Sequence, residues 1–320
     1  MRSFTYLCNL NLSFFNLNIK PKHWVTLFIL ALVWGSSFIL IKRGIEYFTP
    51  IQVGALRIAL AGLFLLPISV KSIKSLPKKN FHWLFLTAIV GSFIPMFLFP
   101  IAEVHLDSSI AGIFNALMSI FVIVLGVVFF KYKTHFGEIT GVILSFIGVI
   151  LLLRSSSENG VHTSNEWVYH LMLICAALMY AYSGLLTQKY MGNLSSIVWT
   201  AFIELVLLIP ALIVLIISGF FKTIWEHPEA LKGIGFVFIL ALFGSVLANI
   251  FYYKLIRETS ASFASSVSLL MPLVAFCWGL LDGENLGFIQ ITGGILIVLG
   301  LYFGRKEINL PKQKTRKKLI

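Results

Sequence analysis

Charged residues are scarce in this chain of 320 residues: 12% are Asp, Glu, Lys or Arg, whereas 58% are apolar. In soluble domains, about a quarter of the residues are charged. A soluble protein of this length needs more polar side chains to cover its surface than the sequence supplies. The composition therefore excludes a soluble protein and indicates an integral membrane protein.

Acidic residues are fewer than basic residues, 13 against 25, which gives a net charge of +12. The basic residues gather at the ends of apolar runs, and seven of them fall in the last sixteen residues, from Arg305 to Lys318. Basic residues at such places contact anionic lipid headgroups and set membrane orientation. We therefore expect the lipid bilayer as a partner and no nucleic acid.

Cysteines and catalytic motifs are also rare. The three cysteines lie far apart, so we expect no metal site and no disulfide framework, and we expect Cys175 and Cys277 to be small buried hydrophobic residues. The sequence has no His-Glu-x-x-His, Gly-x-Ser-x-Gly or phosphate-binding loop. We expect no catalytic residues and no cofactor, so a membrane-embedded enzyme is only the alternative interpretation.

Long apolar runs are the dominant feature of the sequence. A helix needs about 20 mostly apolar residues to cross about 30 Å of hydrocarbon. The chain is thus predicted to be an all-α integral membrane protein with ten transmembrane helices, at 24–41, 51–70, 81–102, 108–130, 136–153, 167–187, 195–218, 234–253, 262–281 and 286–303. Residues 1–23 are predicted to be a disordered or surface-lying leader, 155–166 a linker loop and 305–320 a basic cytoplasmic tail; whether residues 1–20 belong to the native start stays open.

Orientation follows from the distribution of Lys and Arg. With the N-terminus inside, the inner segments hold nineteen of them and the outer loops five, including Lys42 and Arg43. This bias predicts that both termini are cytoplasmic. We expect a multi-pass protein of a bacterial inner (plasma) membrane.

The sequence repeats itself about halfway along. Gly91-Ser92 recurs as Gly244-Ser245, 153 residues later, and the same offset aligns Leu117-Met118 with Leu270-Met271. The repeat predicts two five-helix halves, 24–154 and 167–304. Because five is odd, the second half enters the membrane inverted, as in many secondary transporters that bind substrate near the midplane.

Several motifs resemble those of a known family. Trp34-Gly35-Ser36-Ser37-Phe38, Pro50 and Ala55-Leu56-Arg57 resemble the opening of an EamA-type repeat, and the stretches 260–262, 270–273, 283–284 and 292–296 resemble its close. The chain is therefore similar, over about residues 25–304, to the drug/metabolite transporter superfamily. The halves are unequal, because Ser119 stands where the second half has Pro272, and Lys131 where it has Glu284.

The resemblance implies a secondary transporter that moves a small metabolite, amino acid or drug-like compound by alternating access. We expect export, with an uptake or exchange permease as an alternative. Coupling to protons or sodium stays open, as do the substrate and the oligomeric state.

Arg57 and Glu204 are the ionisable residues well inside the predicted spans, about 9 Å and 13 Å deep at about 1.5 Å per residue. A charge at such depth is expected to face a cavity or a partner. The two residues occupy equivalent places in the second helix of each half. They are either a substrate-binding or gating pair or a structural ion pair, and the sequence favours neither.

A central cavity is expected between the halves, lined mainly by the first, third, fourth, sixth, eighth and ninth spans, with the fifth and tenth at the periphery. Its polar and aromatic candidates, each of which could instead serve helix packing, are Trp34, Ser37, Asn115, Tyr180, Tyr182, Asn249 and Ser268. Pro95 and Pro272 are candidate hinges or static bends. Glu103, His105 and Asp107 are expected in a solvated loop, with metal or proton chemistry as the alternative. Tyr252 is a further polar and aromatic candidate, but it and Tyr253 lie near a span end, where aromatic residues are routinely interfacial anchors.

Overall fold

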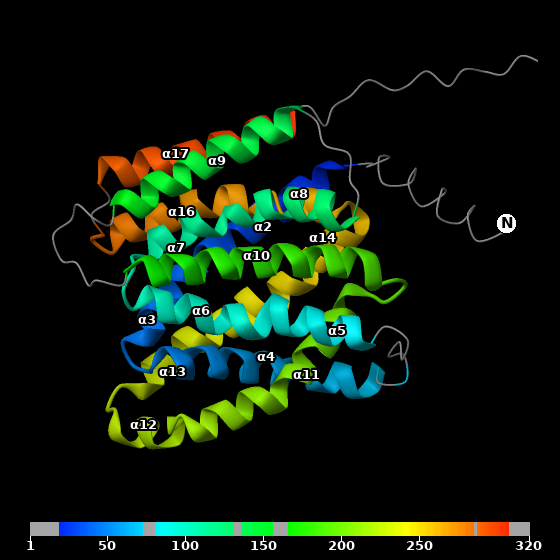
Figure 1. Ribbon diagram of the computed structural model, residues 1–320. Helices are drawn as coiled ribbons and strands as arrows, with labels where there is room; N and C mark the ends of the chain where they lie inside the picture. The colour runs from blue at the N-terminus through cyan, green and yellow to red at the C-terminus, as the bar shows by residue number, and fades with distance from the viewer. Residues whose placement is uncertain are drawn as a thin grey trace, which may run out of the picture.

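The computed structural model describes residues 19–72, 74, 81–130, 136–155, 166–284 and 287–306. Within these ranges the regular structure is entirely helical (Figure 1). The predicted leader, linker and tail lie largely outside them, and so does Lys131. The helices are α2 (Pro21–Gly35), α3 (Ser37–Ile45), α4 (Pro50–Ser72), α5 (Phe81–Ala88), α6 (Ile94–Glu103), α7 (Ser108–Asn115), α8 (Leu117–Phe130), α9 (Phe136–Ser155), α10 (Glu166–Tyr190), α11 (Ser196–Ile217), α12 (Phe220–Glu226), α13 (Ala230–Ile239), α14 (Ala248–Glu258), α15 (Ala261–Ala264), α16 (Val267–Leu281) and α17 (Phe288–Lys306).

Eight helical segments of the described residues are long and apolar enough to cross a bilayer. Each matches one predicted span, although several of them combine consecutive helices, such as α2 with α3 and α7 with α8. The other two predicted spans correspond to α9 and α17, and the apolar part of α17, Phe288–Gly300, is shorter than the other spans. The chain is therefore a multi-pass helical membrane protein.

Two span boundaries differ from the prediction. The first span continues to Ile45, so Lys42 and Arg43 lie in the last turn of α3 rather than in a loop. The helix continues because its buried face, with Ile41 and Gly44, packs against the bundle, while the basic side chains reach acidic partners beyond it. The eighth span is also longer, from Ala230 to Glu258.

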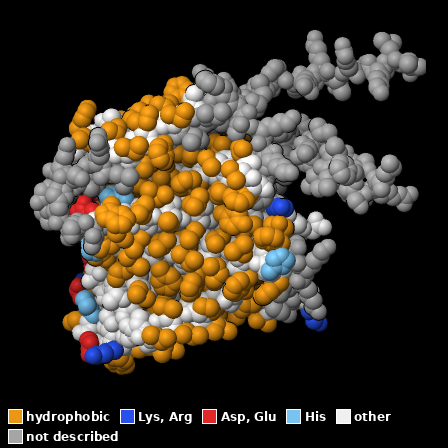
Figure 2. Space-filling model, in the orientation of Figure 1, with side chains coloured by type: hydrophobic (Ala, Val, Ile, Leu, Met, Phe, Trp, Pro, Cys, Tyr) orange, Lys and Arg blue, Asp and Glu red, His pale blue; other side chains and the backbone are white. Residues whose placement is uncertain are grey.

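The spanning helices lie side by side along one axis (Figure 1), with α9 and α17 packed together at one edge and α4 packed against α11 toward the other. The bundle has two ends. We call them the Glu284 end, where α3 ends and α7 begins, and the Glu258 end, where α2 begins and α14 ends. A broad apolar surface separates charged groups gathered toward these ends (Figure 2), as a lipid-facing belt requires.

The repeated Gly-Ser pairs lie in two π-helical segments, Ile89–Phe93 between α5 and α6 and Leu240–Leu247 between α13 and α14. Short π-helical turns often occur at functional sites. A side chain at Gly91 would collide with Ser183 of α10, so glycine at this position permits the close approach of the two helices. The recurring Gly-Ser pairs therefore mark the π-helical turns of two spans, one in each half of the sequence.

The prediction for two of the cysteines is wrong. Cys175 and Cys277 are exposed on the outer surfaces of α10 and α16. The reason is that the surface of a membrane protein is itself apolar, so an apolar run does not distinguish a lipid-facing residue from a core residue.

Candidate functional site

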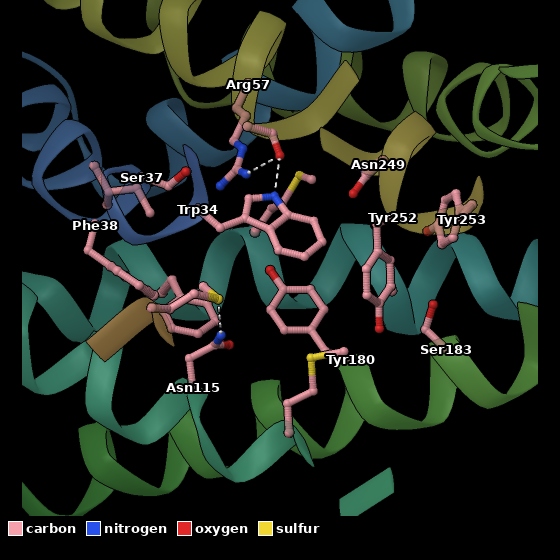
Figure 3. A pocket seen from close by; sticks show the side chains of 17 residues that line it. Trp34, Ser37, Phe38, Arg57, Asn115, Tyr180, Ser183, Asn249, Tyr252 and Tyr253 are labelled. Atoms are coloured by element: carbon pink, nitrogen blue, oxygen red, sulfur yellow. Dashed lines mark hydrogen bonds between the residues drawn. The ribbon is translucent and has the colours of Figure 1, made fainter. Parts of the chain in front are cut away.

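A cavity of about 70 Å³ lies inside the bundle (Figure 3). Since one buried water needs roughly 10–15 Å³, this cavity has room for a few waters or for part of a small ligand. Its lining contains residues of both sequence halves: Trp34, Ser37, Phe38, Ile41, Arg57, Gly91, Met96, Phe99, Asn115, Met118, Tyr180, Ser183, Gly244, Asn249, Tyr252, Tyr253 and Met271.

The structure brings six of the sequence-predicted site residues together around this cavity: Trp34, Ser37, Arg57, Asn115, Tyr180 and Asn249. They come from α2, α3, α4, α7, α10 and α14. Among the described residues, none that lines the cavity belongs to α9, α11 or α17. The site is thus built by helices from both halves, with α9 and α17 packed on each other away from it.

Polar bonds cross between the halves at the cavity wall. The indole Nε1 of Trp34 donates to the carbonyl oxygen of Gly244 at 2.8 Å, and Nε of Arg57 donates to Oγ of Ser245 at 2.8 Å. Both acceptors belong to the π-helical segment Leu240–Leu247. The first half therefore contacts the second at one of the two widened helical turns.

Aromatic rings form much of the remaining wall. The rings of Trp34 and Tyr252 meet edge to face with centroids 5.0 Å apart, and those of Phe99 and Tyr180 stack at 5.9 Å. Such pairs are geometrically specific and stiff. A few polar groups in an apolar, aromatic wall are typical of a small-molecule site.

The structure places three candidates outside the cavity lining. Tyr182 packs its ring near that of Phe129, with centroids 6.3 Å apart. Ser268 is fully buried, lies 2.9 Å from the hydroxyl of Ser119 and donates to the carbonyl of Ala116 at 3.3 Å, as a helix-packing serine does. Glu204 is fully buried on α11, which packs against α4.

The two candidate hinges are both buried. Pro95 lies in the first turn of α6, directly after the π-helical segment that contains Gly91, and Pro272 lies inside α16. Met271, next to Pro272, lines the cavity. Within the described ranges, no group of three or more His, Cys, Asp or Glu side chains is arranged to hold a metal ion.

Glu103 corrects the expectation of a solvated loop. It lies in the last turn of α6 with 5% of its surface exposed, and neither carboxylate oxygen has a hydrogen-bond partner among the described residues. The oxygens of Glu204 likewise have none, although Asn249 is a polar neighbour. Arg57 interacts electrostatically with both Glu103 and Glu204, but it forms no ion pair with either in the described structure.

Glu284 is bonded very differently. At the Glu284 end its carboxylate accepts hydrogen bonds from Lys42 Nζ at 2.8 Å, from the backbone N–H groups of Ser108 and Ser109 at 3.0 and 3.1 Å, and from both serine hydroxyls. The carboxylate therefore caps the N-terminus of α7. We call Lys42, Ser108, Ser109, Asp282 and Glu284 the Glu284 cluster.

Asp282 completes this cluster. Its carboxylate pairs with Lys42 Nζ at 2.6 Å and with the guanidinium of Arg43. Burial alone would raise the pKa of Glu284, but the hydrogen bonds from Lys42, Ser109 and Ser108 outweigh it and hold this pKa below its ordinary value. Burial and the neighbouring Glu284 carboxylate raise the pKa of Asp107.

The Glu258 end has a smaller polar bridge. The carboxylate of Glu258 lies 2.8 Å from Lys22 Nζ and 3.1 Å from His23 Nε2, which connects the end of α14 to the start of α2. Each end of the bundle is therefore bridged between the two sequence halves by charged groups.

Sequence reasoning missed several lining residues. Tyr252 and Tyr253 line the cavity instead of anchoring an interface, because the eighth span continues to Glu258, past its predicted end at residue 253. The pairing of Lys42 with Glu284 joins residues 242 positions apart, and no local pattern signals it. The sequence predicts the turn at Asp282-Gly283, but it does not predict which residues contact that turn.

The fold and the site together define a multi-pass helical membrane protein with an internal, aromatic-walled cavity built by two sequence halves. Comparison with known proteins agrees with this class. The profile of the EamA-like transporter family matches residues 22–154 and again residues 167–304. The chain belongs to the EamA-like transporter family.

The matches to curated relatives cover most of this chain and most of each relative. An uncharacterized transporter of Archaeoglobus fulgidus is 25% identical over 88% of this chain and 98% of its own. An uncharacterized inner membrane transporter of Escherichia coli strain K12 is 27% identical, over 89% and 94%. A probable amino-acid metabolite efflux pump of Salmonella typhimurium is 26% identical, over 86% and 91%.

A solved crystal structure shares the fold. It superposes with a TM-score of 0.63 over 90% of this chain and 97% of the other, at 14% sequence identity. The family and the names of the relatives point to a membrane transporter rather than to an enzyme. A transporter of this family is expected to bind a small-molecule substrate within the lipid bilayer.

Proposed function

We propose that this protein is a secondary transporter that exports a small metabolite, amino acid or drug-like compound by alternating access. The observation that carries the proposal is the cavity, because both sequence halves line it and polar bonds from Trp34 and Arg57 cross between them. A site between two halves changes its access when the halves move relative to each other.

The proposed architecture has ten spans in two inverted five-helix halves. The two matches to the family profile and the paired π-helical segments support it. The Glu284 cluster and the Glu258 bridge then serve as alternating closures at the two ends of the cavity. Export is supported by the Salmonella relative, which is named a probable amino-acid metabolite efflux pump, and an uptake or exchange permease is the alternative.

A flux experiment tests the proposal. The full chain is reconstituted in proteoliposomes, and a library of amino acids, small metabolites and drugs is screened for flux under imposed pH and sodium gradients. We expect flux of a chemically restricted set, driven by one of the gradients. Hydrolysis or another turnover of the compounds without flux would indicate the membrane-embedded enzyme instead.

The membrane orientation is tested separately with single cysteines. In a variant with Cys8, Cys175 and Cys277 replaced by Ser, cysteine is introduced at Thr49 or at Asn193, two exposed residues near opposite ends of the bundle. Because the basic residues favour cytoplasmic termini, an impermeant maleimide should label Thr49→Cys in intact cells and Asn193→Cys only after permeabilisation. The opposite pattern would reverse the orientation.

A further inference from the structure

Arg57 is the cation of the cavity. It lies on α4 with 7% of its surface exposed, and its side chain points toward the same space as the rings of Trp34 and Tyr180 (Figure 3). At this depth in the bilayer a cation is costly unless an anion or several acceptors compensate it. The question is therefore which group compensates the guanidinium.

The protein satisfies this guanidinium only in part. Of its nitrogens, Nε donates to Ser245 at 2.8 Å and Nη2 makes a long contact of 3.5 Å with the carbonyl of Gly244, which already accepts from Trp34. Within the described residues, Nη1 has no acceptor and Arg57 has no ion-pair partner. A guanidinium has five N–H donors arranged to bind a carboxylate with two parallel bonds, so most of this capacity faces the cavity.

The acidic residues do not fill the gap. Glu204 and Glu103 interact with Arg57 electrostatically, yet their oxygens form no hydrogen bond in the described structure and neither residue lines the cavity. The backbone of Glu204 packs close to α4, since a Cβ added at Gly62 would lie 3.1 Å from the carbonyl oxygen of Glu204. The open side of the guanidinium is thus accessible from the cavity rather than from these carboxylates.

Asn115 supplies an independent indication of a ligand. It is 3% exposed and lines the same cavity, its Nδ2 donates weakly to the sulfur of Met271 at 3.4 Å, and its Oδ1 has no partner. An unpaired buried acceptor is costly unless a donor reaches it. In Figure 3, Arg57 and Asn115 enter the cavity from different sides, with the rings of Trp34 and Tyr180 in view between them.

We propose that the substrate is a small carboxylate with an apolar body, whose carboxylate binds Arg57 and whose amino or amide N–H donates to Oδ1 of Asn115. The aromatic wall contacts the body. Among the classes that a transporter of this family could move, the site therefore selects amino acids and similar carboxylates over cationic drugs. This inference rests on the proposed transport function, but it concerns binding and is tested by binding.

The test uses matched probes on the purified full chain in lipid nanodiscs at pH 7. Four bodies (methyl, isobutyl, benzyl and indolylmethyl) are each presented as the amino acid, the amino-acid amide, the decarboxylated amine and the deaminated acid. For at least one body, the amino acid should bind about tenfold or more tightly than its amide and amine, since charge-assisted hydrogen bonds are among the strong ones. The deaminated acid should bind with intermediate affinity.

Variants assign the two anchors. Arg57→Gln should remove the preference for the amino acid over its amide, Arg57→Lys should keep part of it, and Asn115→Ala should remove the advantage of the amino acid over the deaminated acid. Arg257→Gln is the matched control, because Arg257 is exposed at the Glu258 end and donates to the carbonyl of Leu194. It should leave all affinities within about twofold.

Two results would overturn the proposal. One is a wild-type protein that binds no carboxylate better than the matching amide and amine, which needs no variant and so does not depend on variant folding. The other is an Arg57→Gln protein with the wild-type preference. Flux of the same probes separates the two proposals. Carboxylate-selective binding without flux would refute the transport function and support the binding site. Flux of amides and amines without a preference for carboxylates would support the transport function and refute the binding site.

Discussion

The acidic residues of this protein fall into two contrasting environments. At the Glu284 end, one carboxylate accepts hydrogen bonds from two backbone N–H groups, two hydroxyls and a lysine. Inside the bundle, Glu103 and Glu204 are as deeply buried, yet their carboxylate oxygens have no hydrogen bond in the described part of the chain. The hydrogen-bonded carboxylate stabilises the folded protein. The two carboxylates without hydrogen bonds contribute little to its stability.

The difference predicts where function resides. A buried ionisable group that the fold does not satisfy is kept for a reason other than stability, and in membrane proteins such groups mark substrate or ion pathways. A fully bonded carboxylate that joins α3, α7 and the turn after α16 is instead suited to hold one end of the bundle closed. Two substitutions of acidic residues and one pH dependence test this comparison.

The largest effect on stability is expected from Glu284→Ala. It leaves the first N–H groups of α7 without their acceptor and Lys42 with Asp282 as its remaining partner. Removal of one partner of a buried, hydrogen-bonded pair costs about 3–5 kcal/mol. The free energy of unfolding, measured by denaturant titration in mixed micelles, should fall by about that amount. Glu46→Ala is the control, because Glu46 pairs with Arg43 at the same end but is exposed, and it should cost less than about 1 kcal/mol. Equal losses in the two variants would contradict the assigned role of the cluster.

An opposite pattern is expected from Glu204→Gln. The substitution removes a desolvated charge whose oxygens have no hydrogen bond, so the free energy of unfolding should change by less than about 1 kcal/mol. Flux in proteoliposomes should fall by about tenfold, because the charge acts on Arg57 in the cavity wall. Glu226→Gln, at an exposed residue of α12, should change neither quantity. Wild-type flux with reduced stability in Glu204→Gln would show that the interior carboxylate is structural.

The smallest effect on stability is expected when the pH is lowered. The folded pKa of Glu284 lies below the ordinary value of 4.5, so its stabilisation is complete above about pH 4.5 and is lost as the pH falls through the lower folded value. Asp107 has a raised pKa and contributes in the opposite direction, which reduces the net change. The melting temperature should therefore fall modestly below about pH 4.5. The pKa of Glu258 is also lowered, chiefly by its hydrogen bond from Lys22, and this residue contributes in the same direction as Glu284. Glu284→Gln should therefore reduce the fall, and an unchanged pH profile in that variant would contradict the assignment.

Sequence predicted the spanning segments well because length and hydropathy are local properties, and eight of them match helices long enough to cross a bilayer. Arg57 and Asn115 were recognisable because a charge or amide within an apolar run needs partners inside the bundle. Their membership in one cavity is seen in the structure, and their role in binding stays a prediction.

The remaining features depend on tertiary structure. Glu103 lies at the end of its helix, where sequence cannot distinguish a solvated residue from a buried one. Tyr252 and Tyr253 resemble interfacial aromatics until the length of α14 is known, and Ser268 resembles Asn115 until its bonds with Ser119 and Ala116 are seen. The partners of Lys42 come from a distant turn, so sequence proximity gives no sign of them.

The hydrogen bond from Trp34 to Gly244 has a practical consequence for spectroscopy. Indole emission shifts to longer wavelength when the ring meets water, and Trp34 is one of seven tryptophans in the chain. With the other six replaced by phenylalanine, the emission of this single indole would report on the cavity from within. If the halves separate during the transport cycle, the bond at 2.8 Å breaks. The movement would then appear as a shift in the emission wavelength of Trp34, without any attached dye.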